Sequence, residues 1–477
     1  MPRGHTSTTQ ASAVTKKRVP APSAGKDTTL RLKTLSVVQL FHLYDHTIDL
    51  HLDERITIIH GPNGVGKTVL LTMLAAIFQG KYYELVRYPF LTLDLTFVDG
   101  SVLNIETLET TKDQIAPDAT PGLRISLKTP TEMPQPFVYE WNRAAFSSVI
   151  AQAEPFLPIH RQTADLWYDQ LANETVSTVE VFERYYDSFP DALRQQLTPE
   201  PEWMASLRER LPVYFIETQR LLDFVRNRAA RTRAGIQDRT PFTYAVRSIA
   251  ADLAQRISQT TQLYAMRSQA LDQSFPRRLL TESVNTYSVD DLRNWMSKLD
   301  DTRTKFRRLG ILGEETDYPL EKETLEKVGD QERKVMTFYV EDSMAKLEPL
   351  QDLFNRTSLL LNIVNAKFNH KTVEVSRQHG FVVTDDKGRS LALNNLSSGE
   401  QHELVLAYSL LFKVRANSLV LIDEPELSLH IEWQTAFLND LLEIVKNSHF
   451  DVILATHSPN IVGTHDDLMV TLSGTVS

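Results

Sequence analysis

Cysteine is absent from all 477 residues, so the chain forms no disulfide and offers no thiolate to a metal. Any bound metal is therefore expected to have oxygen or imidazole ligands. The sequence also lacks an uninterrupted apolar run of about 18 residues, which a membrane-spanning helix needs, and its first residues lack the apolar core of a secretory signal. These absences predict a cytoplasmic protein without a membrane segment.

The chain has fewer basic side chains (51) than acidic ones (61), which gives it a formal net charge of −10. A surface of this sign repels nucleic acid on average. Basic side chains are densest between Arg226 and Arg239. Two interpretations of this stretch stay open: it contacts the phosphates of a nucleic acid or an acidic partner surface, or it is a solvated loop.

The content of apolar residues, 42%, is enough for a large core and for more than one structural unit. Residues 1–27 are rich in Ser, Thr, Ala and Pro without apolar periodicity, which predicts a disordered tail that carries a basic triplet. Alternating apolar residues predict strands from Leu30 to about residue 141, among them a hairpin around Asp99-Gly100.

The middle of the chain has mostly helical patterns. We expect helices from about residue 142 to 207, a buried strand at 211–222, and long helices at 244–271, 290–306 and 334–368. Short strands at 373–375, 381–384 and 391–393 are expected to return the chain to a mixed sheet. Little Pro or Gly interrupts the long helices, which favours paired helices that project from a core.

One stretch fits the phosphate-binding consensus G-x-x-x-x-G-K-[ST], between a short apolar strand at 56–60 and an apolar helix at 69–78. Glycines let the backbone curl so that its N–H groups face the phosphates of one nucleotide. Lys67 is expected to reach the β- and γ-phosphates, and the Thr68 hydroxyl to bind Mg²⁺. The stretch consists of Gly61, Pro62, Asn63, Gly64, Val65, Gly66, Lys67 and Thr68.

Two further groups of candidates lie in loops, one near this stretch and one after a later strand. Residues 40–46 contain several rings, and Tyr44 or His42 is a candidate contact for the adenine, although core packing explains Phe41 and Tyr44 equally well. Gln219 lies in the loop that the buried strand within 211–222 enters, where it either senses the γ-phosphate through Mg²⁺ or water, or is an ordinary polar loop residue.

A second group of motifs lies in the last hundred residues. Ser397, Ser398, Gly399 and Glu400 precede an apolar helix, and the S-x-x-E spacing of Ser397 and Glu400 predicts a capping box at a helix start that favours an anion. An apolar strand then ends in Asp423 and Glu424, which suit a Mg²⁺ ligand and a general base for water. Another buried strand ends near His457, which we expect to contact the γ-phosphate.

Together these ordered motifs resemble the ABC-type ATPases, in the soluble branch that includes RecF, SMC-like proteins and OLD nucleases. The resemblance identifies 61–68 as the Walker A loop, 396–401 as the signature motif, 419–424 as Walker B, 426–430 as the D-loop and His457 as the switch histidine. About 330 residues separate Thr68 from Ser397, which is too many for a transporter subunit.

The resemblance implies an α/β fold: an ABC-type ATPase head that has a mixed or parallel P-loop sheet, an antiparallel β subdomain and a large inserted helical domain. It assigns residues 28–141 and 371–477 to the two halves of the core. Residues 142–370 form the mainly helical insertion, in which the strand near 213–222 returns to the core. It also implies that two subunits enclose two ATP molecules with Mg²⁺.

Among stand-alone relatives, the chain looks most like the AriA ATPases of PARIS anti-phage defence. That likeness implies a sensor and scaffold that holds a separate Toprim-type nuclease until a phage protein triggers its release. The alternative is a RecF- or SMC-like ATPase of DNA repair or maintenance, which binds duplex DNA through its helical arms and basic stretch.

Overall fold

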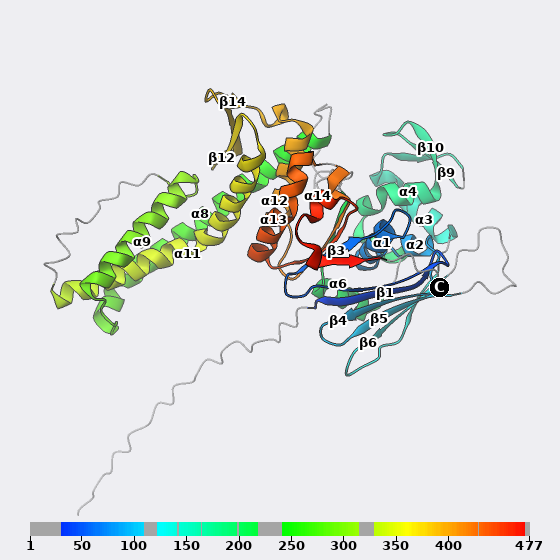
Figure 1. The fold of residues 1–477 in the computed structure, drawn as a ribbon, viewed down its shortest axis with the longest axis horizontal. Helices are drawn as coiled ribbons and strands as arrows, with labels where there is room; N and C mark the ends of the chain where they lie inside the picture. The colour runs from blue at the N-terminus through cyan, green and yellow to red at the C-terminus, as the bar shows by residue number, and fades with distance from the viewer. Residues whose placement is uncertain are drawn as a thin grey trace, which may run out of the picture.

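The computed structural model describes residues 30–108, 122–140, 143–163, 165–197, 200–217, 241–313, 329–427 and 429–472. The expected tail, the basic stretch from Arg226 to Arg239 and Gln219 lie outside these ranges. Figure 1 shows a central sheet flanked by an antiparallel sheet, a small α/β module and a long helical arm that extends to one side.

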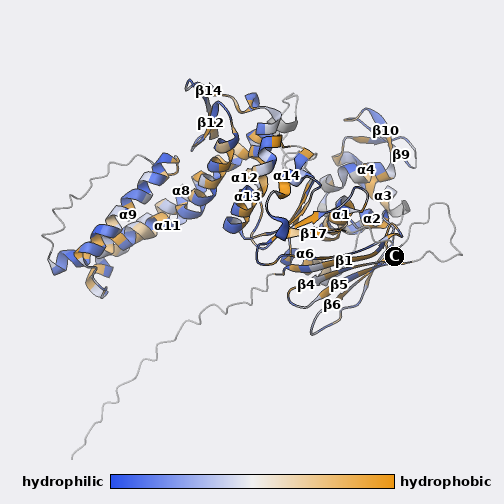
Figure 2. Cartoon of the chain, viewed as in Figure 1, coloured by the Kyte–Doolittle hydropathy of each residue, from blue (hydrophilic) through white to orange (hydrophobic). Residues whose placement is uncertain are grey.

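Five parallel strands form the central sheet in the order β11-β15-β16-β3-β17. Strands β3, β15 and β16 are almost entirely apolar and buried, as expected for strands covered on both faces. The figure coloured by hydropathy shows this apolar centre (Figure 2). The strands are β3 (Ile56–His60), β11 (Val213–Glu217), β15 (Leu419–Asp423), β16 (Asp451–Ala455) and β17 (Met469–Thr471).

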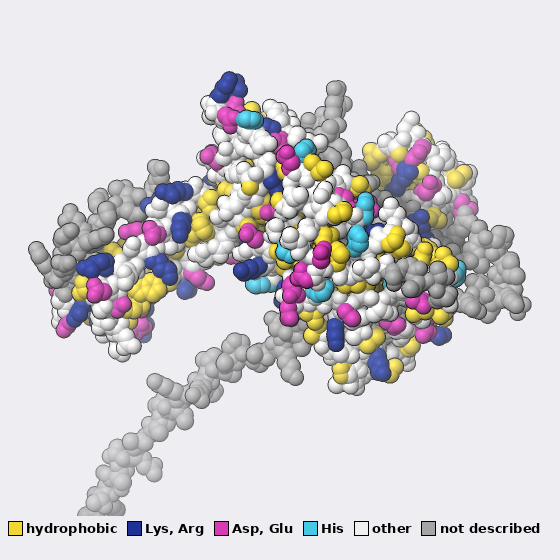
Figure 3. All heavy atoms as spheres, in the orientation of Figure 1, with side chains coloured by type: hydrophobic (Ala, Val, Ile, Leu, Met, Phe, Trp, Pro, Cys, Tyr) yellow, Lys and Arg dark blue, Asp and Glu magenta, His cyan; other side chains and the backbone are white. Residues whose placement is uncertain are grey.

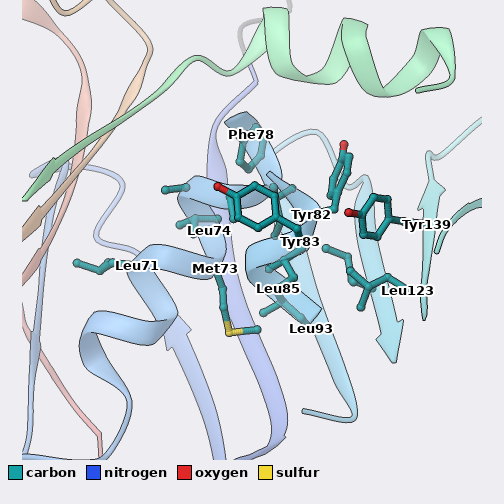
Figure 4. Close-up of a cluster of buried hydrophobic side chains, with 14 of the residues drawn as sticks. Leu71, Met73, Leu74, Phe78, Tyr82, Tyr83, Leu85, Leu93, Leu123 and Tyr139 are labelled. Carbon is teal, nitrogen blue, oxygen red and sulfur yellow. The ribbon is translucent and has the colours of Figure 1, made fainter. Parts of the chain in front are cut away.

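A six-stranded antiparallel sheet, in the order β2-β1-β4-β5-β6-β7, packs against helices α1 (Lys67–Gln79) and α2 (Tyr82–Val86). Its strands alternate buried and exposed residues, so one face is apolar. Leu74 of α1 and Leu93 and Leu123 of the sheet belong to one buried cluster (Figure 4). The strands are β1 (Leu32–Leu40), β2 (Tyr44–Asp49), β4 (Thr92–Phe97), β5 (Val102–Leu108), β6 (Gly122–Lys128) and β7 (Phe137–Tyr139).

Residues 143–210 form a small α/β module, whereas the sequence predicted helices alone. A three-stranded antiparallel sheet separates the helices. Each strand has only three or four residues, so the alternation is too short to stand out in the sequence. The module contains α3 (Arg143–Ala153), β8 (Ile159–Arg161), β9 (Leu166–Asp169), β10 (Glu174–Ser177), α4 (Thr178–Tyr185), α5 (Asp191–Leu197) and α6 (Glu202–Arg210).

Three long helices form the arm, as the sequence predicted: α8 (Pro241–Thr281), α9 (Val289–Arg308) and α11 (Asp330–Lys367). An ion pair between Arg278 and Asp342, with atoms 2.6 Å apart, joins α8 to α11. Among the described residues, no helix has the length and apolar character needed to cross a membrane.

The short strands after the arm form a separate antiparallel sheet at its base, so the expectation that they return to the mixed sheet was wrong. They are β12 (Lys371–Ser376), β13 (Gly380–Asp385) and β14 (Ser390–Leu391). Gly380 explains the placement: a Cβ there would lie 1.9 Å from the Ala250 carbonyl oxygen, so β13 packs directly on α8. This sheet therefore belongs structurally to the arm.

Helices α12 (Ser398–Phe412), α13 (Ile431–Ser448) and α14 (Pro459–Val462) lie between the arm and the central sheet (Figure 1). A buried ion cluster joins three helices, because Lys367 of α11 contacts Glu403 of α12 and Asp440 of α13, the latter at 2.7 Å. The arrangement confirms the α/β class, with a P-loop sheet, an antiparallel β subdomain and an inserted helical part.

Candidate functional site

Segments that are far apart in sequence meet at the carboxyl edge of the central sheet. The Walker-type loop follows β3, Asp423 ends β15, and His457 lies two residues after β16. The register places Glu217, Asp423 and Ala455 side by side on adjacent strands. Because all five strands are parallel, the candidate residues that follow them gather at this one edge.

The loop 61–66 curls through two glycines that have left-handed backbone angles. Gly64 has a φ of 89° and Gly66 has a φ of 97°. Residues that have a side chain rarely adopt these angles. A Cβ on Gly66 would also lie 2.6 Å from a methyl carbon of Leu40, in the strand β1 that leads to the β1–β2 turn. The glycine consensus is thus required both by the backbone path and by the close approach of this hairpin.

Lys67 lies at the first position of α1 and turns back over the loop. Its Nζ donates hydrogen bonds to the carbonyl oxygens of Gly61 (2.8 Å) and Pro62 (3.0 Å), and the residue is only 6% exposed. The ammonium group is therefore placed at the loop beside a helix start, where its charge and the helix dipole both favour a phosphate.

His46 supports the loop from the inside of the antiparallel sheet. Its Nε2 lies 2.8 Å from the Val65 carbonyl oxygen, and because a carbonyl only accepts, Nε2 donates. The ring is buried and stacks on Tyr44. The sequence indicated Tyr44 or His42 as a candidate adenine contact, with core packing of Tyr44 as the alternative, and the contact remains a prediction. His46 was missed, although a histidine at an inward position of an alternating strand requires a buried partner.

Thr68 and Asp423 come together across 355 positions of sequence, because Thr68 Oγ1 donates to Asp423 Oδ1 at 3.2 Å. A hydroxyl and a carboxylate at this spacing suit Mg²⁺, which keeps several waters and binds substrate phosphates. No cluster of three or more acidic or histidine side chains in the described ranges forms a separate metal site.

Glu424 follows directly in a strained backbone conformation, with φ 44°. Its N–H donates to the Ala455 carbonyl oxygen at 2.9 Å, which fixes the turn against β16. A left-handed residue other than glycine costs roughly 1–3 kcal/mol, and such strain clusters at functional sites. The Glu424 carboxylate lies 3.6 Å from His457 Nδ1, so the predicted base and the predicted switch histidine are neighbours.

Glu426 also contacts the His457 segment, and the sequence assigned it no role beyond the start of the D-loop. Its side chain is 7% exposed, and Oε1 lies 3.3 Å from His457 Nδ1. Oε1 also accepts hydrogen bonds from Thr456 Oγ1 (2.8 Å) and the His457 N–H (3.1 Å). Figure 3 shows histidine and acidic side chains gathered on the face around α13 and α14.

The capping box at the start of α12 is present: Ser397 Oγ accepts from the Glu400 N–H, and Glu400 accepts from the Ser397 N–H. Glu400 also binds Lys371 at 2.7 Å. Burial alone would raise the pKa of Glu400, but hydrogen bonds from Lys371 and Ser397 lower this pKa below its ordinary value. These contacts face the arm.

The other signature residues are Ser397, Ser398 and Gly399 at the start of α12. A Cβ on Gly399 would meet Trp433 of α13, while Ser397 and Ser398 are exposed. The structure thus groups Lys67, Thr68, Asp423, Glu424 and His457 at the sheet edge, and places the signature turn separately, against Lys371 and α13.

Residues 316–463 match a family model described as AAA domain, putative AbiEii toxin, Type IV TA system. The matched segment contains Asp423, Glu424 and His457 and lies downstream of the glycine-rich loop. The chain is similar to P-loop ATPases.

A retron Vc95 probable ATPase of Vibrio cholerae serotype O1 biovar El Tor is 26% identical over 194 residues. The alignment covers 38% of this chain and 37% of the relative, so the chain spans little more than a third of that protein's length.

Two solved structures align with most of this chain. One is an Smc head domain with an extended coiled coil, bound to the C-terminal domain of ScpA and derived from Pyrococcus furiosus. It has 11% sequence identity and a TM-score of 0.34, and the alignment covers 94% of this chain and 95% of that one. The SMC head domain from Thermotoga maritima has 11% identity and a TM-score of 0.31, covering 94% and 97%.

Proposed function

We propose that this chain is an ABC-type ATPase that binds ATP with Mg²⁺ between two copies of itself and hydrolyses it. We further propose that this cycle makes it a sensor and scaffold controlling a separate, Toprim-type nuclease in anti-phage defence, with a phage protein as trigger. In this proposal residues 28–141 and 371–477 are the core halves, and 142–370 is the insertion.

One observation carries the nucleotide-binding part: the hydrogen bond from Thr68 to Asp423, beside the loop that Lys67 closes. Lys67 and the loop amides would hold the β- and γ-phosphates, and Thr68 and Asp423 would bind Mg²⁺ or its waters. Bound Mg²⁺ would neutralise part of the negative charge on the phosphates.

The hydrolytic part is supported by the pair that follows. Glu424 is held at the sheet edge by its backbone bond to Ala455, where its carboxylate would orient water and accept its proton. His457 lies beside it and would contact the γ-phosphate. Ser397, Ser398 and Gly399 would bind the nucleotide held by the second subunit, since Ser397 and Ser398 are exposed at a helix start that favours an anion. The buried Glu400 would hold this turn through its hydrogen bond with the Ser397 N–H.

The defence role is inferred from similarity to other proteins. It is consistent with the likeness to a protein described as a retron ATPase and to a family described as a putative AbiEii toxin. The nuclease, its trigger and the resemblance to the AriA family remain part of the proposal, as does the cytoplasmic location.

The first experiment is nucleotide binding by the purified chain, measured calorimetrically with ATP and Mg²⁺. Lys67→Ala is expected to abolish binding, because it removes the cation at the loop. Lys446→Ala removes an exposed lysine at the end of α13 and should bind as the parent does. Equal affinity of the Lys67 variant and the parent would contradict the site.

The second experiment distinguishes a protein partner from DNA. The chain is co-expressed with the product of the adjacent gene, and co-purification of a nuclease in the absence of DNA affinity supports the defence role. The RecF- or SMC-like role is supported instead if the chain binds duplex DNA in a salt-dependent way and loses this binding when the arginines from Arg226 to Arg239 are replaced by alanine.

A further inference from the structure

The Glu426 carboxylate is held by hydrogen bonds just after the end of β16. Its carboxylate Oε1 accepts from Thr456 Oγ1 at 2.8 Å and from the His457 N–H at 3.1 Å. Its own carbonyl oxygen accepts from Gln434 Nε2 at 3.1 Å, which anchors the short turn Pro425–Leu427 to α13. Both the backbone and the side chain of Glu426 are therefore fixed.

The imidazole of His457 lies against this fixed carboxylate. Its Nδ1 is 3.3 Å from Glu426 Oε1 and 3.6 Å from Glu424 Oε1, so one ring nitrogen faces two carboxylates. A bare Nδ1 would direct its lone pair at negative oxygen atoms, which is unfavourable, whereas an Nδ1–H is attracted to them. The surroundings therefore favour the tautomer that carries its proton on Nδ1.

We infer that Glu426 is a positioning residue for His457, which fixes the ring's orientation and keeps the proton of the neutral ring on Nδ1, so that Nε2 is the nitrogen directed to substrate. This inference rests on the proposed function, because it names the support of the residue proposed to contact the γ-phosphate. A carboxylate that holds a functional histidine in one tautomer is a general device in enzyme sites.

The division of labour between the two carboxylates follows from their exposure. The Glu426 side chain is 7% exposed and accepts two hydrogen bonds from the residues that directly follow β16, whereas the Glu424 side chain is 30% exposed at the sheet edge. Glu424 is thus placed to reach water, and Glu426 to hold the ring.

The test is the ¹⁵N spectrum of the His457 ring at a pH where the imidazole is neutral, in the full chain labelled at histidine. Subtracting the spectrum of His457→Asn identifies the signal among the 13 histidines. The parent is expected to show Nδ1 protonated and Nε2 bare. Glu426→Ala should shift the signal toward the Nε2–H tautomer, while Glu432→Gln, an exposed change on α13, should leave it unchanged.

Steady-state kinetics give the second measurement. Glu426→Ala is expected to lower kcat about 10- to 100-fold without weakening nucleotide binding, as for other residues that orient a functional histidine. In a His457→Ala background the same substitution should have little further effect, because the group through which it acts is gone. Glu426→Gln, which retains an acceptor oxygen, should fall between the parent and Glu426→Ala.

Two outcomes would overturn the inference. The first is a parent ring that carries its proton on Nε2, or a tautomer that is the same in the parent and both Glu426 variants. The second is an equal loss of kcat from Glu426→Ala with and without His457. The spectrum requires no turnover, so it decides the positioning role even for a chain that releases no phosphate, which would instead contradict the proposed function.

Discussion

Single side chains at the carboxyl edge of the central sheet divide the proposed chemistry among them. Thr68 and Asp423 share a hydrogen bond, and the strained Glu424 lies next to them beside His457. Strain at Glu424 costs stability, and it persists because the Ala455 carbonyl and the buried strand β15 fix the turn.

Glu424→Gln is therefore expected to leave ATP binding intact and to lower steady-state phosphate release by about 10²–10⁴-fold, since an amide cannot accept the proton of water. The measurement is phosphate release at saturating MgATP. Glu432→Gln on the exposed first turn of α13 is the matched control, because it changes the same group away from the site. If the Glu424 variant hydrolyses ATP at the parental rate, Glu424 is not the general base.

The sequence predicted these residues because their spacing reports local structure. A glycine-rich loop before Lys67 and an apolar strand before Asp423 both encode a strand end, and parallel strands align such ends. His46 and Glu426 were missed as supports because their partners, Val65 and His457, are distant in sequence. Nothing in a local pattern tells which buried polar group a side chain will meet.

Helix α12 joins the signature turn to the arm through polar contacts along its length. Glu400 binds Lys371, Glu403 binds Lys367, and the Tyr408 hydroxyl donates to Asp252 of α8 at 2.7 Å. The buried Lys367 keeps its charge because Glu403 and Asp440 face it, although burial opposes that charge. A helix with this many fixed contacts is expected to move together with the arm base rather than alone.

His402 on the same helix gives a pH dependence with a definite sign. Burial lowers its pKa from the ordinary 6.5 to about 4, so the unfolded chain takes up a proton before the folded chain does. The unfolding free energy should therefore fall as pH drops from about 6.5 to about 4, by about 2 kcal/mol between pH 7 and pH 5 from this residue.

Chemical denaturation of the parent and of His402→Leu at both pH values measures this effect. The leucine variant lacks the titrating ring, so the difference between its two unfolding free energies should be smaller than the parent's by that amount. Equal pH dependence of the two proteins would show that other groups account for the acid sensitivity.

The elements themselves were predictable to different degrees. The arm helices follow from long periodic segments, and the hairpin at Asp99-Gly100 follows from its turn residues. The strands β8, β9 and β10 were missed because three or four residues carry too little alternation. The sheet β12–β14 was placed wrongly because its packing on α8 depends on one glycine, Gly380, against a distant carbonyl.

Across the complete chain, the two halves of the proposed nucleotide site face different surroundings. The loop that holds Lys67 lies at the sheet edge, while the exposed start of α12, with Ser397 and Ser398, is held toward the arm by Lys371 and α13. The anion-favouring turn therefore suits a nucleotide on a second copy of the chain. ATP would then link two subunits, and its hydrolysis would release them.

Ser398→Arg is expected to prevent this association, because the arginine side chain adds bulk where the partner's nucleotide would lie and places a positive charge beside the partner's Lys67. The substitution is made in the Glu424→Gln background, in which bound ATP is not consumed, and the mass in solution is measured by light scattering with and without MgATP. The Glu424→Gln chain should become a dimer with ATP, while the double variant binds ATP and stays monomeric.

Asn447→Arg, which adds the same charge at an exposed position near the end of α13, should still dimerise. ATP-dependent dimers of the Ser398 variant would show that the signature turn lies outside the interface, and a Glu424→Gln chain that binds ATP without associating would contradict the shared site.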